Sequence, residues 1–138
     1  MPTIIKLQGK GRVKGVAEGE ALVCRERISF WGGFNPFTGQ IVEIGHPLHG
    51  QSVKGKVLVF ISSKGSTAGS TVVSLAGLLG NVPAAMINSE IDDLAVQSCI
   101  ACGLPLISDL DADPFEAIAT GDYVRVDGEK GTVEVTKE

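Results

Sequence analysis

The sequence has few of the features that mark secreted, membrane-bound or nucleic-acid-binding proteins. It contains three cysteines, one tryptophan and one tyrosine in 138 residues. An odd number of cysteines without a framework spacing argues against a disulfide-stabilised secreted domain and favours a reducing, cytoplasmic setting. No apolar run approaches the roughly 20 residues that span a bilayer, and the N-terminus lacks the features of a signal peptide. We therefore expect no membrane partner.

Positive charge is scarce as well. The chain has 12 lysines and arginines against 16 acidic residues, a net charge of −4 and a pI near 5.2. Because no basic run accompanies this acidic balance, we expect no nucleic-acid partner. The length fits one domain, and the 43% hydrophobic content is enough for a sizeable core.

The most informative stretch runs from Lys54 to Gly80. Residues 57–61 are apolar and largely β-branched, which predicts a strand covered on both faces. A turn rich in serine and glycine follows, and from Thr67 apolar residues recur at helical spacing until Gly80. Such a turn points free backbone N–H groups and hydroxyls at one spot, which suits a carboxylate, a phosphate or a developing oxyanion.

The flanking sequence predicts a single β/β/α domain of the α/β class over residues 1–138. Its first half is rich in strands and loops: short extended pieces in residues 1–20, strands at 21–24 and 41–44, an apolar segment at 28–31, a turn at 35–39 and a loop at 46–50. From about residue 56, strands alternate with helices: strands at 82–88 and 104–108, helices at 92–102 and 115–119. This alternation predicts a parallel sheet. A C-terminal hairpin at about 122–136 and the antiparallel pieces near the N-terminus would form a second layer.

The hydroxyl of Ser66 has two interpretations. A serine alkoxide needs helix-end N–H groups and positive charge to stabilise it, and Lys64 lies two residues away. Alternatively, Ser66 or Thr67 simply caps the helix, since serine and threonine are ordinary caps. The local sequence favours the role of a helix cap and does not exclude the role of a catalytic base for Ser66.

Two further patterns carry competing hypotheses. Cys99 and Cys102 form a CxxC, and His46 and His49 an HxxH, which together could bind zinc. Because the CxxC falls inside a predicted apolar helix, we expect buried thiols and no metal in this chain. The aromatic cluster at residues 30–34 either belongs to the core or forms an exposed surface that contacts another protein.

Three segments in a fixed order resemble a known family. They are GEALV at 19–23, ISFWGG with NPFTG at 28–39, and GKVLVF leading to KGSTAGS at 55–70. Their order and spacing resemble the small subunit of the aconitase X family, and the match extends to residues 83–85 and 121–126. The resemblance implies a swivelling β/β/α domain, similar to the mobile domain of aconitases. It also implies a large partner subunit that carries an iron–sulfur cluster, with no cofactor in this chain.

Carried over by position, the resemblance assigns the catalytic base to Ser66. It implies that Gly65 lets the backbone approach the substrate, that Lys64 binds it, and that Thr67 and Ser70 orient the base or bind a carboxylate. The family often has proline and glycine at positions 61 and 63, where this chain has isoleucine and serine. Ser62 and Ser63 therefore remain competitors for the role.

The resemblance implies a hydro-lyase that acts on a small phosphorylated hydroxy acid. The segment at residues 103–105 favours the archaeal form of the family, whose substrate is mevalonate 5-phosphate. The alternatives are cis-3-hydroxy-L-proline as the substrate, or a module that binds an anion or a protein without chemistry.

Overall fold

The computed structural model describes residues 2–138, in which ten strands and three helices follow one another. The elements are β1 (Thr3–Gln8), β2 (Lys10–Val13), β3 (Val16–Cys24), β4 (Phe34–Asn35), β5 (Gln40–Ile41), β6 (Val57–Phe60), α1 (Gly69–Leu78), β7 (Ala85–Asn88), α2 (Asp93–Cys102), β8 (Leu106–Ser108), α3 (Pro114–Ala117), β9 (Tyr123–Asp127) and β10 (Thr132–Lys137). None of the helices among these residues is both long enough and apolar enough to cross a membrane.

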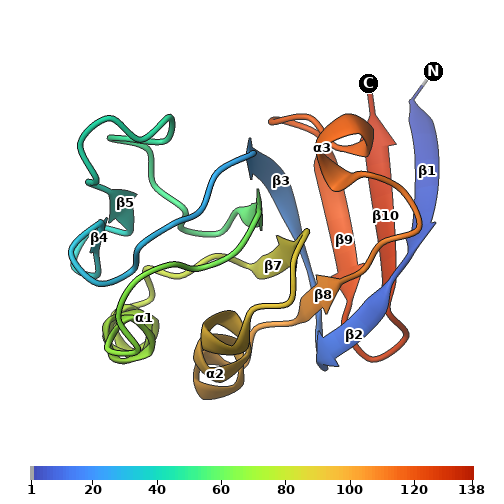
Figure 1. The fold of residues 1–138 in the computed structure, drawn as a ribbon. Coiled ribbons are helices and arrows are strands. Elements are labelled where there is room, and N and C mark those ends of the chain that lie inside the picture. Colours follow the sequence, from blue (N-terminus) through green and yellow to red (C-terminus); the bar gives the residue numbers. More distant parts are fainter. Residues whose placement is uncertain (1) are drawn as a thin grey trace.

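Eight strands form one sheet in the order β1-β10-β9-β3-β6-β7-β8-β2. Strands β3, β6, β7 and β8 run parallel, as the alternation of strands and helices predicts. Strands β1, β10, β9 and β3 pair antiparallel. The two edge strands, β1 and β2, are consecutive in the chain and meet at Gly9, so the sheet curls into a barrel-like shape (Figure 1).

Strand β3 joins the two halves of this sheet. Its first part pairs with β9 and its second part with β6, so the two parts are hydrogen-bonded into one curled sheet. The antiparallel strands pack against the parallel strands across a shared core, which confirms the predicted second layer. The strand predicted at 21–24 is therefore too short, because β3 begins at Val16 and continues through Gly19 without a break. A Cβ at Gly19 would lie 2.5 Å from the carbonyl oxygen of Gly55, so this glycine serves a close approach of two backbones.

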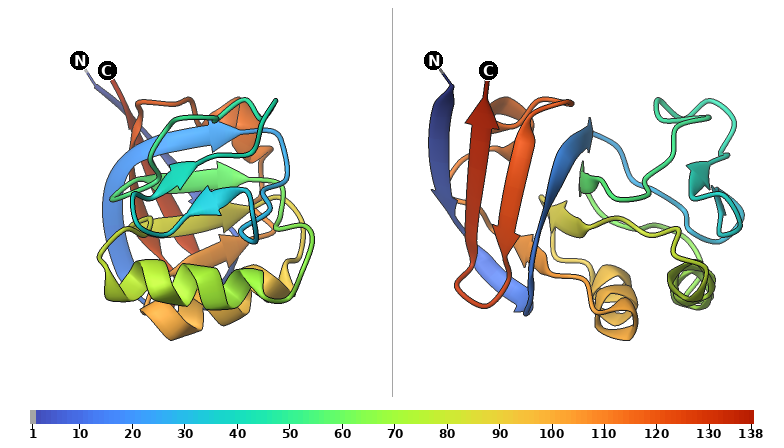
Figure 2. Two further views of the ribbon diagram at one scale, coloured as in Figure 1. Left: turned by 90° about the vertical axis from the view of Figure 1, so that its left-hand side faces the viewer. Right: turned by 180° about the vertical axis from the view of Figure 1, so that it is seen from behind.

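Two cores lie on opposite faces of the parallel strands. In β6, Val57 and Val59 belong to a core inside the barrel, while Leu58 and Phe60 belong to a second core under α1, α2 and residues 28–53. This arrangement confirms the prediction of a strand covered on both faces. Figure 2 shows α1, α2 and the 28–53 segment on one side of the parallel strands and the antiparallel strands on the other.

Local capping signals place two of the helices as expected. The Asp92 side chain accepts the N–H of Ala95 at 3.0 Å, and α2 ends at Gly103 in the left-handed conformation. Pro114 opens α3, but this helix stops at Ala117, before the predicted end at 119. The physical reason is that Ile118 takes an extended conformation and is buried in the barrel core.

Two predicted strands are shorter in the structure. The strand expected at 41–44 is only Gln40–Ile41, because Ile41 is buried while Val42 and Ile44 are exposed. The strand expected at 82–88 begins at Ala85. The C-terminal hairpin forms as predicted, with Val133 opposite Val126 and Val135 opposite Val124.

Candidate functional site

The turn between β6 and α1 is anchored at its base by two other segments. The Ile28 N–H donates to the Ser62 carbonyl at 3.1 Å, and the Lys64 N–H donates to the Ile28 carbonyl at 3.0 Å. The Ser63 N–H donates to the Asp92 carboxylate at 2.5 Å, using the oxygen that does not cap α2. The start of the turn is therefore held in place by residues distant in sequence.

The exposed part of the turn begins at Gly65, which has a φ of +88°. Only glycine adopts this conformation without strain, and the Cβ of another residue would lie 3.2 Å from Ser29 Oγ. Ser66 and Thr67 follow and are both exposed. Gly65 thus turns the chain outward and presents the Ser66 hydroxyl to solvent.

Helix α1 starts two residues later than the spacing predicts. It begins at Gly69, and Ala68 occupies the N-cap position without a side-chain hydrogen bond, so neither Ser66 nor Thr67 caps the helix in the ordinary way. Instead, Ser66 Oγ accepts the N–H of Ala68 at 3.1 Å. This contact is a local serine turn, and it stabilises negative charge on the oxygen.

At this site, the backbone N–H groups without an acceptor among the described residues belong to the turn that precedes α1 and not to the first turn of the helix itself. The first N–H groups of α1 donate to carbonyls of the turn, as Gly69 does to Ser66 at 3.0 Å. In contrast, the N–H groups of Gly65, Ser66 and Thr67 donate to no acceptor within residues 2–138. Successive unpaired N–H groups after a left-handed residue form a concave site that favours an anion.

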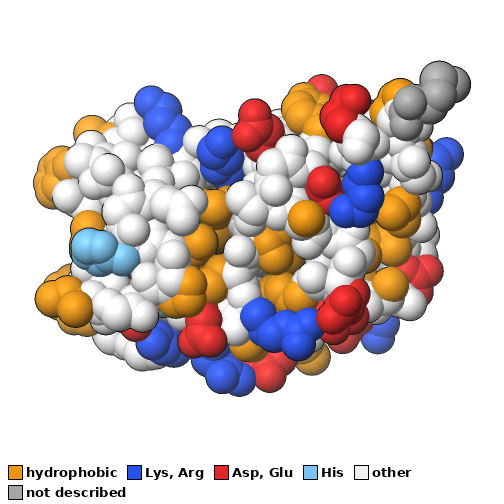
Figure 3. All heavy atoms as spheres, turned by 90° about the horizontal axis from the view of Figure 1, so that it is seen from above, with side chains coloured by type: hydrophobic (Ala, Val, Ile, Leu, Met, Phe, Trp, Pro, Cys, Tyr) orange, Lys and Arg blue, Asp and Glu red, His pale blue; other side chains and the backbone are white. Residues whose placement is uncertain are grey.

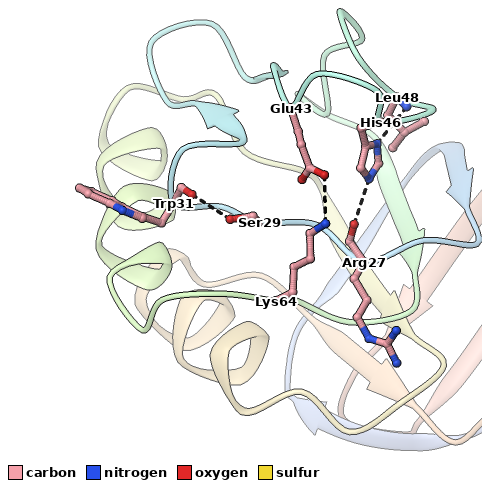
Figure 4. A network of polar contacts seen from close by, with 7 residues as sticks. All are labelled: Arg27, Ser29, Trp31, Glu43, His46, Leu48 and Lys64. Atoms are coloured by element: carbon pink, nitrogen blue, oxygen red, sulfur yellow. Dashed lines mark hydrogen bonds and ion pairs between the residues drawn. The ribbon is translucent and has the colours of Figure 1, made fainter.

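Lys64 adds a positive charge beside these donors, and the structure already pairs it. Its Nζ lies 3.0 Å from Glu43 Oε2, while Glu43 Oε1 is buried without a hydrogen-bond partner among the described residues. Figure 4 shows the pair next to Ser29 and the His46 ring. An anion that binds Lys64 must therefore compete with Glu43.

The remaining predicted serines differ in accessibility. Ser62 is only 7% exposed, and its hydroxyl donates to the Ser63 carbonyl at 3.1 Å. Ser63, Ser66 and Ser70 line one narrow hollow together with Lys64, and this hollow is too small to admit a water molecule. The Ser70 hydroxyl donates to the Thr67 carbonyl at 3.1 Å, which leaves its oxygen free to accept. The structure thus brings Ser63, Ser66 and Ser70 together and keeps Ser62 apart.

Two polar residues near the turn were missed by the sequence reasoning. Glu43 lies in a segment predicted as a plain strand, and nothing local indicates its partner Lys64. Asn88 ends β7 opposite Phe60, is 1% exposed, and has no hydrogen-bond partner for either amide atom among the described residues. A signal was available for Asn88, since it is the polar residue at the end of an otherwise apolar run.

The cysteine and histidine pairs do not assemble into a metal site. Both ring nitrogens of His46 are engaged, Nε2 with the Arg27 carbonyl at 3.0 Å and Nδ1 with the Leu48 N–H at 3.0 Å. Burial raises the pKa of the Cys99 thiol far above its ordinary value, so the thiolate that a metal requires is disfavoured. Residues 2–138 hold no group of three or more metal-binding side chains. They therefore do not fit an iron–sulfur cluster.

The aromatic cluster divides between the two expected roles. Phe30 packs edge-to-face against Phe34 and Phe60, with ring centroids 5.4 and 6.1 Å apart, and belongs to the core under α1. Trp31, the next residue, is 59% exposed. Part of the cluster is core, and its tryptophan is on the surface.

The fold and the turn together define a β/β/α domain that presents a hydroxyl and free backbone donors beside a parallel strand. The family model of the aconitase X swivel domain matches residues 6–135. A crystal structure of Thermococcus kodakaraensis aconitase X has a TM-score of 0.88 and 37% identity, and the match covers 95% of this chain and 98% of that one. The chain belongs to the aconitase X swivel-domain family.

Proteins named phosphomevalonate dehydratase small subunit are among its relatives. The protein of that name from Methanosarcina acetivorans is 44% identical over 133 residues, which covers 96% of this chain and 92% of the relative. The one from Pyrococcus furiosus is 41% identical over 131 residues, with 95% and 96% covered. The solution structure of a UPF0107 protein is similar as well, with a TM-score of 0.85, 38% identity and coverage of 95% and 98%.

Proposed function

We propose that this chain is the small subunit of a hydro-lyase that dehydrates mevalonate 5-phosphate, active only with a large subunit. The observation that carries the proposal is the set of archaeal relatives with that name, which match this chain over nearly its whole length at about 40% identity. The exposed turn from Lys64 to Ser70 supplies the chemical groups that such a role requires. A cytoplasmic setting is part of the proposal, and it is consistent with three cysteines that form no disulfide.

Ser66 is the proposed base. In a dehydration, a C–H bond and the neighbouring C–O bond break and a carbon–carbon double bond forms. The hydroxide that leaves and the proton that the base takes and then releases together make one molecule of water. Ser66 Oγ takes the proton from carbon, and the Ala68 N–H that it already accepts stabilises the oxygen as an alkoxide. Ser63 is the nearest competitor, because it lines the same hollow.

The anionic groups of the substrate are proposed to bind next to the base. The unpaired N–H groups of Gly65, Ser66 and Thr67 suit a phosphate or a carboxylate. Lys64 contributes a positive charge when its ammonium group leaves Glu43 and pairs with an anionic group of the substrate. Ser70 has an oxygen free to accept a hydrogen bond from a substrate hydroxyl.

The iron–sulfur cluster that the resemblance implies is assigned to the large subunit. The residues described in this chain do not fit such a group, which is consistent with a cluster held by another chain. The chain therefore contributes half of a site, and the relatives' printed name, small subunit, supports a second chain as the other half.

Reconstitution tests the proposal directly. The chain is co-expressed with the large subunit of the same organism, and the complex is assayed on mevalonate 5-phosphate and, in parallel, on cis-3-hydroxy-L-proline. We expect dehydration of the phosphorylated acid only by the complex. Turnover of hydroxyproline alone would contradict the substrate, and an inactive complex of correctly loaded subunits would contradict the enzyme assignment.

A further inference from the structure

Large hydrophobic side chains are exposed at one end of the molecule. Those on residues 28–53, on α1 and directly after it are Trp31, Phe37, Val42, Ile44, Leu75, Leu78 and Leu79, and we call this set the outer apolar face. Ile44 is 93% exposed and Leu78 86%, so neither contributes much to the core of its own chain. Figure 3 shows hydrophobic side chains at the left-hand end, over the 34–50 segment.

The same segments contain almost no charge. Residues 28–53 include one charged side chain, Glu43, and residues 65–80 include none. Glu43 is itself paired with Lys64. A surface helix normally carries charged residues on its outer side, whereas the centre of a protein–protein interface is depleted in charge and enriched in aromatic residues. The composition of the outer apolar face is that of an interface.

Contacts within the chain show that the parts of this face adjoin each other and the Ser66 turn. The Asn81 side chain after α1 donates to the Pro36 carbonyl at 3.1 Å, and the Val42 N–H donates to the Gly33 carbonyl at 2.9 Å. A Cβ on Gly69, the first residue of α1, would lie 3.5 Å from the Trp31 backbone nitrogen. In Figure 4, Trp31 projects beside α1, away from the Lys64–Glu43 pair.

We propose that the outer apolar face is the docking surface for the large subunit, with Trp31 as its anchor. This inference rests on the proposed function, because the Ser66 turn offers half of a site and the chain with the other half must approach the turn. The face adjoins that turn, so the same approach covers it. The partner surface that fits is apolar and uncharged, with a pocket for an indole ring, since exposed tryptophans are frequent interface hot spots.

Aspartate substitutions at matched isoleucines test the surface. Ile44→Asp places a charge on the outer apolar face, and Ile4→Asp places one on β1, at the far end of the molecule, where Ile4 is 57% exposed. The binding of each purified variant to the purified large subunit is measured by titration calorimetry. We expect Ile44→Asp and Leu78→Asp to raise the Kd more than about 30-fold, and Ile4→Asp to change it less than about twofold.

Trp31→Ala tests the anchor, with an expected rise in Kd of at least about 30-fold. Because none of these side chains is part of the proposed site, kcat at a saturating concentration of the small subunit should stay within about twofold of wild type. Circular dichroism and thermal melting of each variant confirm that it is folded before binding is measured.

Each outcome separates the docking surface from the proposed function. If Ile44→Asp, Leu78→Asp and Trp31→Ala bind the large subunit as tightly as wild type, the docking surface is wrong, while dehydration by the wild-type complex still supports the function. If these variants weaken a complex that dehydrates nothing, the docking surface is right and the function is wrong. A wild-type small subunit that forms a dimer by itself, lost in Ile44→Asp, would show that the face binds a second copy and would overturn the inference.

Discussion

The barrel end and the outer end of this domain are built in different ways. The barrel end consists of long paired strands with an interior of fully buried valines, as in the β9–β10 hairpin. The outer end consists mainly of loops, two-residue strands and α1, held over the sheet by buried residues such as Phe30, Ile41 and Val53. Figure 2 shows this contrast between regular strands on one side and irregular chain on the other.

Among the described residues, buried polar atoms without partners and exposed hydrophobic side chains are concentrated near the outer end. The buried side-chain atoms without a partner among residues 2–138 belong to Glu43 and Asn88, and most of the exposed large hydrophobic residues lie between 31 and 79. A domain selected for stability alone would avoid both features. The comparison indicates that the barrel end supplies stability, while the outer end holds the proposed site and the proposed docking surface at a cost in stability.

The largest effect is expected for Ser66→Ala. Removing a general base lowers kcat by about 10²–10⁴-fold, and loss of the hydrogen bond to Ala68 costs about 1 kcal/mol of stability at most. The measurements are kcat of the reconstituted enzyme and thermal melting of the isolated chain. Ser62→Ala serves as the control, because this buried serine should not affect turnover. Full activity of Ser66→Ala would refute the assignment of the base.

Ile107→Ala should produce the opposite pattern, a large loss of stability without a loss of kcat. Ile107 is fully buried in the barrel core, so the truncation should lower the free energy of unfolding by about 3 kcal/mol, measured by urea denaturation. The conservative change Ile107→Val should cost about 1 kcal/mol. The kcat of the assembled enzyme should remain that of wild type in both variants. A large loss of kcat would show that the barrel end is part of the site.

Gly65→Ala and Gly55→Ala introduce the same kind of backbone strain, the first inside the Ser66 turn and the second outside it. Both glycines have positive φ, +88° and +71°, and alanine in this conformation costs about 1–2 kcal/mol. The backbone strain should lower the stability of both variants in a thermal melt, and Gly65→Ala should lose more because its Cβ would also lie 3.2 Å from Ser29 Oγ. Only Gly65→Ala should also reduce kcat/KM, since the conformation of Gly65 sets the direction of Ser66 and of the unpaired N–H groups around it. Equal activity of the two variants would remove Gly65 from the site.

The smallest effect is expected for Glu43→Gln. Breaking the ion pair frees Lys64 for the anionic substrate, so KM should fall by up to about fivefold at low salt, with stability changed by less than about 1 kcal/mol. Glu20→Gln breaks the Lys56–Glu20 pair elsewhere in the molecule, where the charged atoms are 3.3 Å apart. This control should leave KM unchanged. A KM that is insensitive to both substitutions would exclude Lys64 from substrate binding.

Much of the fold could be predicted because its signals are local. The buried strand β6, the Asp92 cap with Gly103, Pro114 at the start of α3 and the C-terminal hairpin each depend on a few neighbouring residues. The errors occurred where a distant contact overrides the local signal. Burial of Ile118 in the barrel ends α3 early, and the approach of Gly55 lets β3 run through Gly19.

The candidate site divides in the same way. The turn itself could be located from the strand, the serines and the family resemblance, whereas the role of Gly65 in letting the backbone approach a substrate stays a prediction. Its electrostatics could not be predicted, because Lys64 pairs with Glu43 and the Ser63 N–H with Asp92 only after the chain has folded. The shift of the helix start to Gly69, which moves the free donors to Gly65, Ser66 and Thr67, also appears only in the structure.

The sequence by itself therefore determined the element types, the buried strand and the position of the Ser66 turn, since these depend on hydrophobic pattern and turn residues within short windows. Tertiary structure alone decided that the antiparallel strands continue the parallel sheet, that Lys64 is paired, and that Trp31 and Ile44 remain outside the core. The physical reason is that pairing and burial depend on which distant segments meet, and that information is spread over the whole chain.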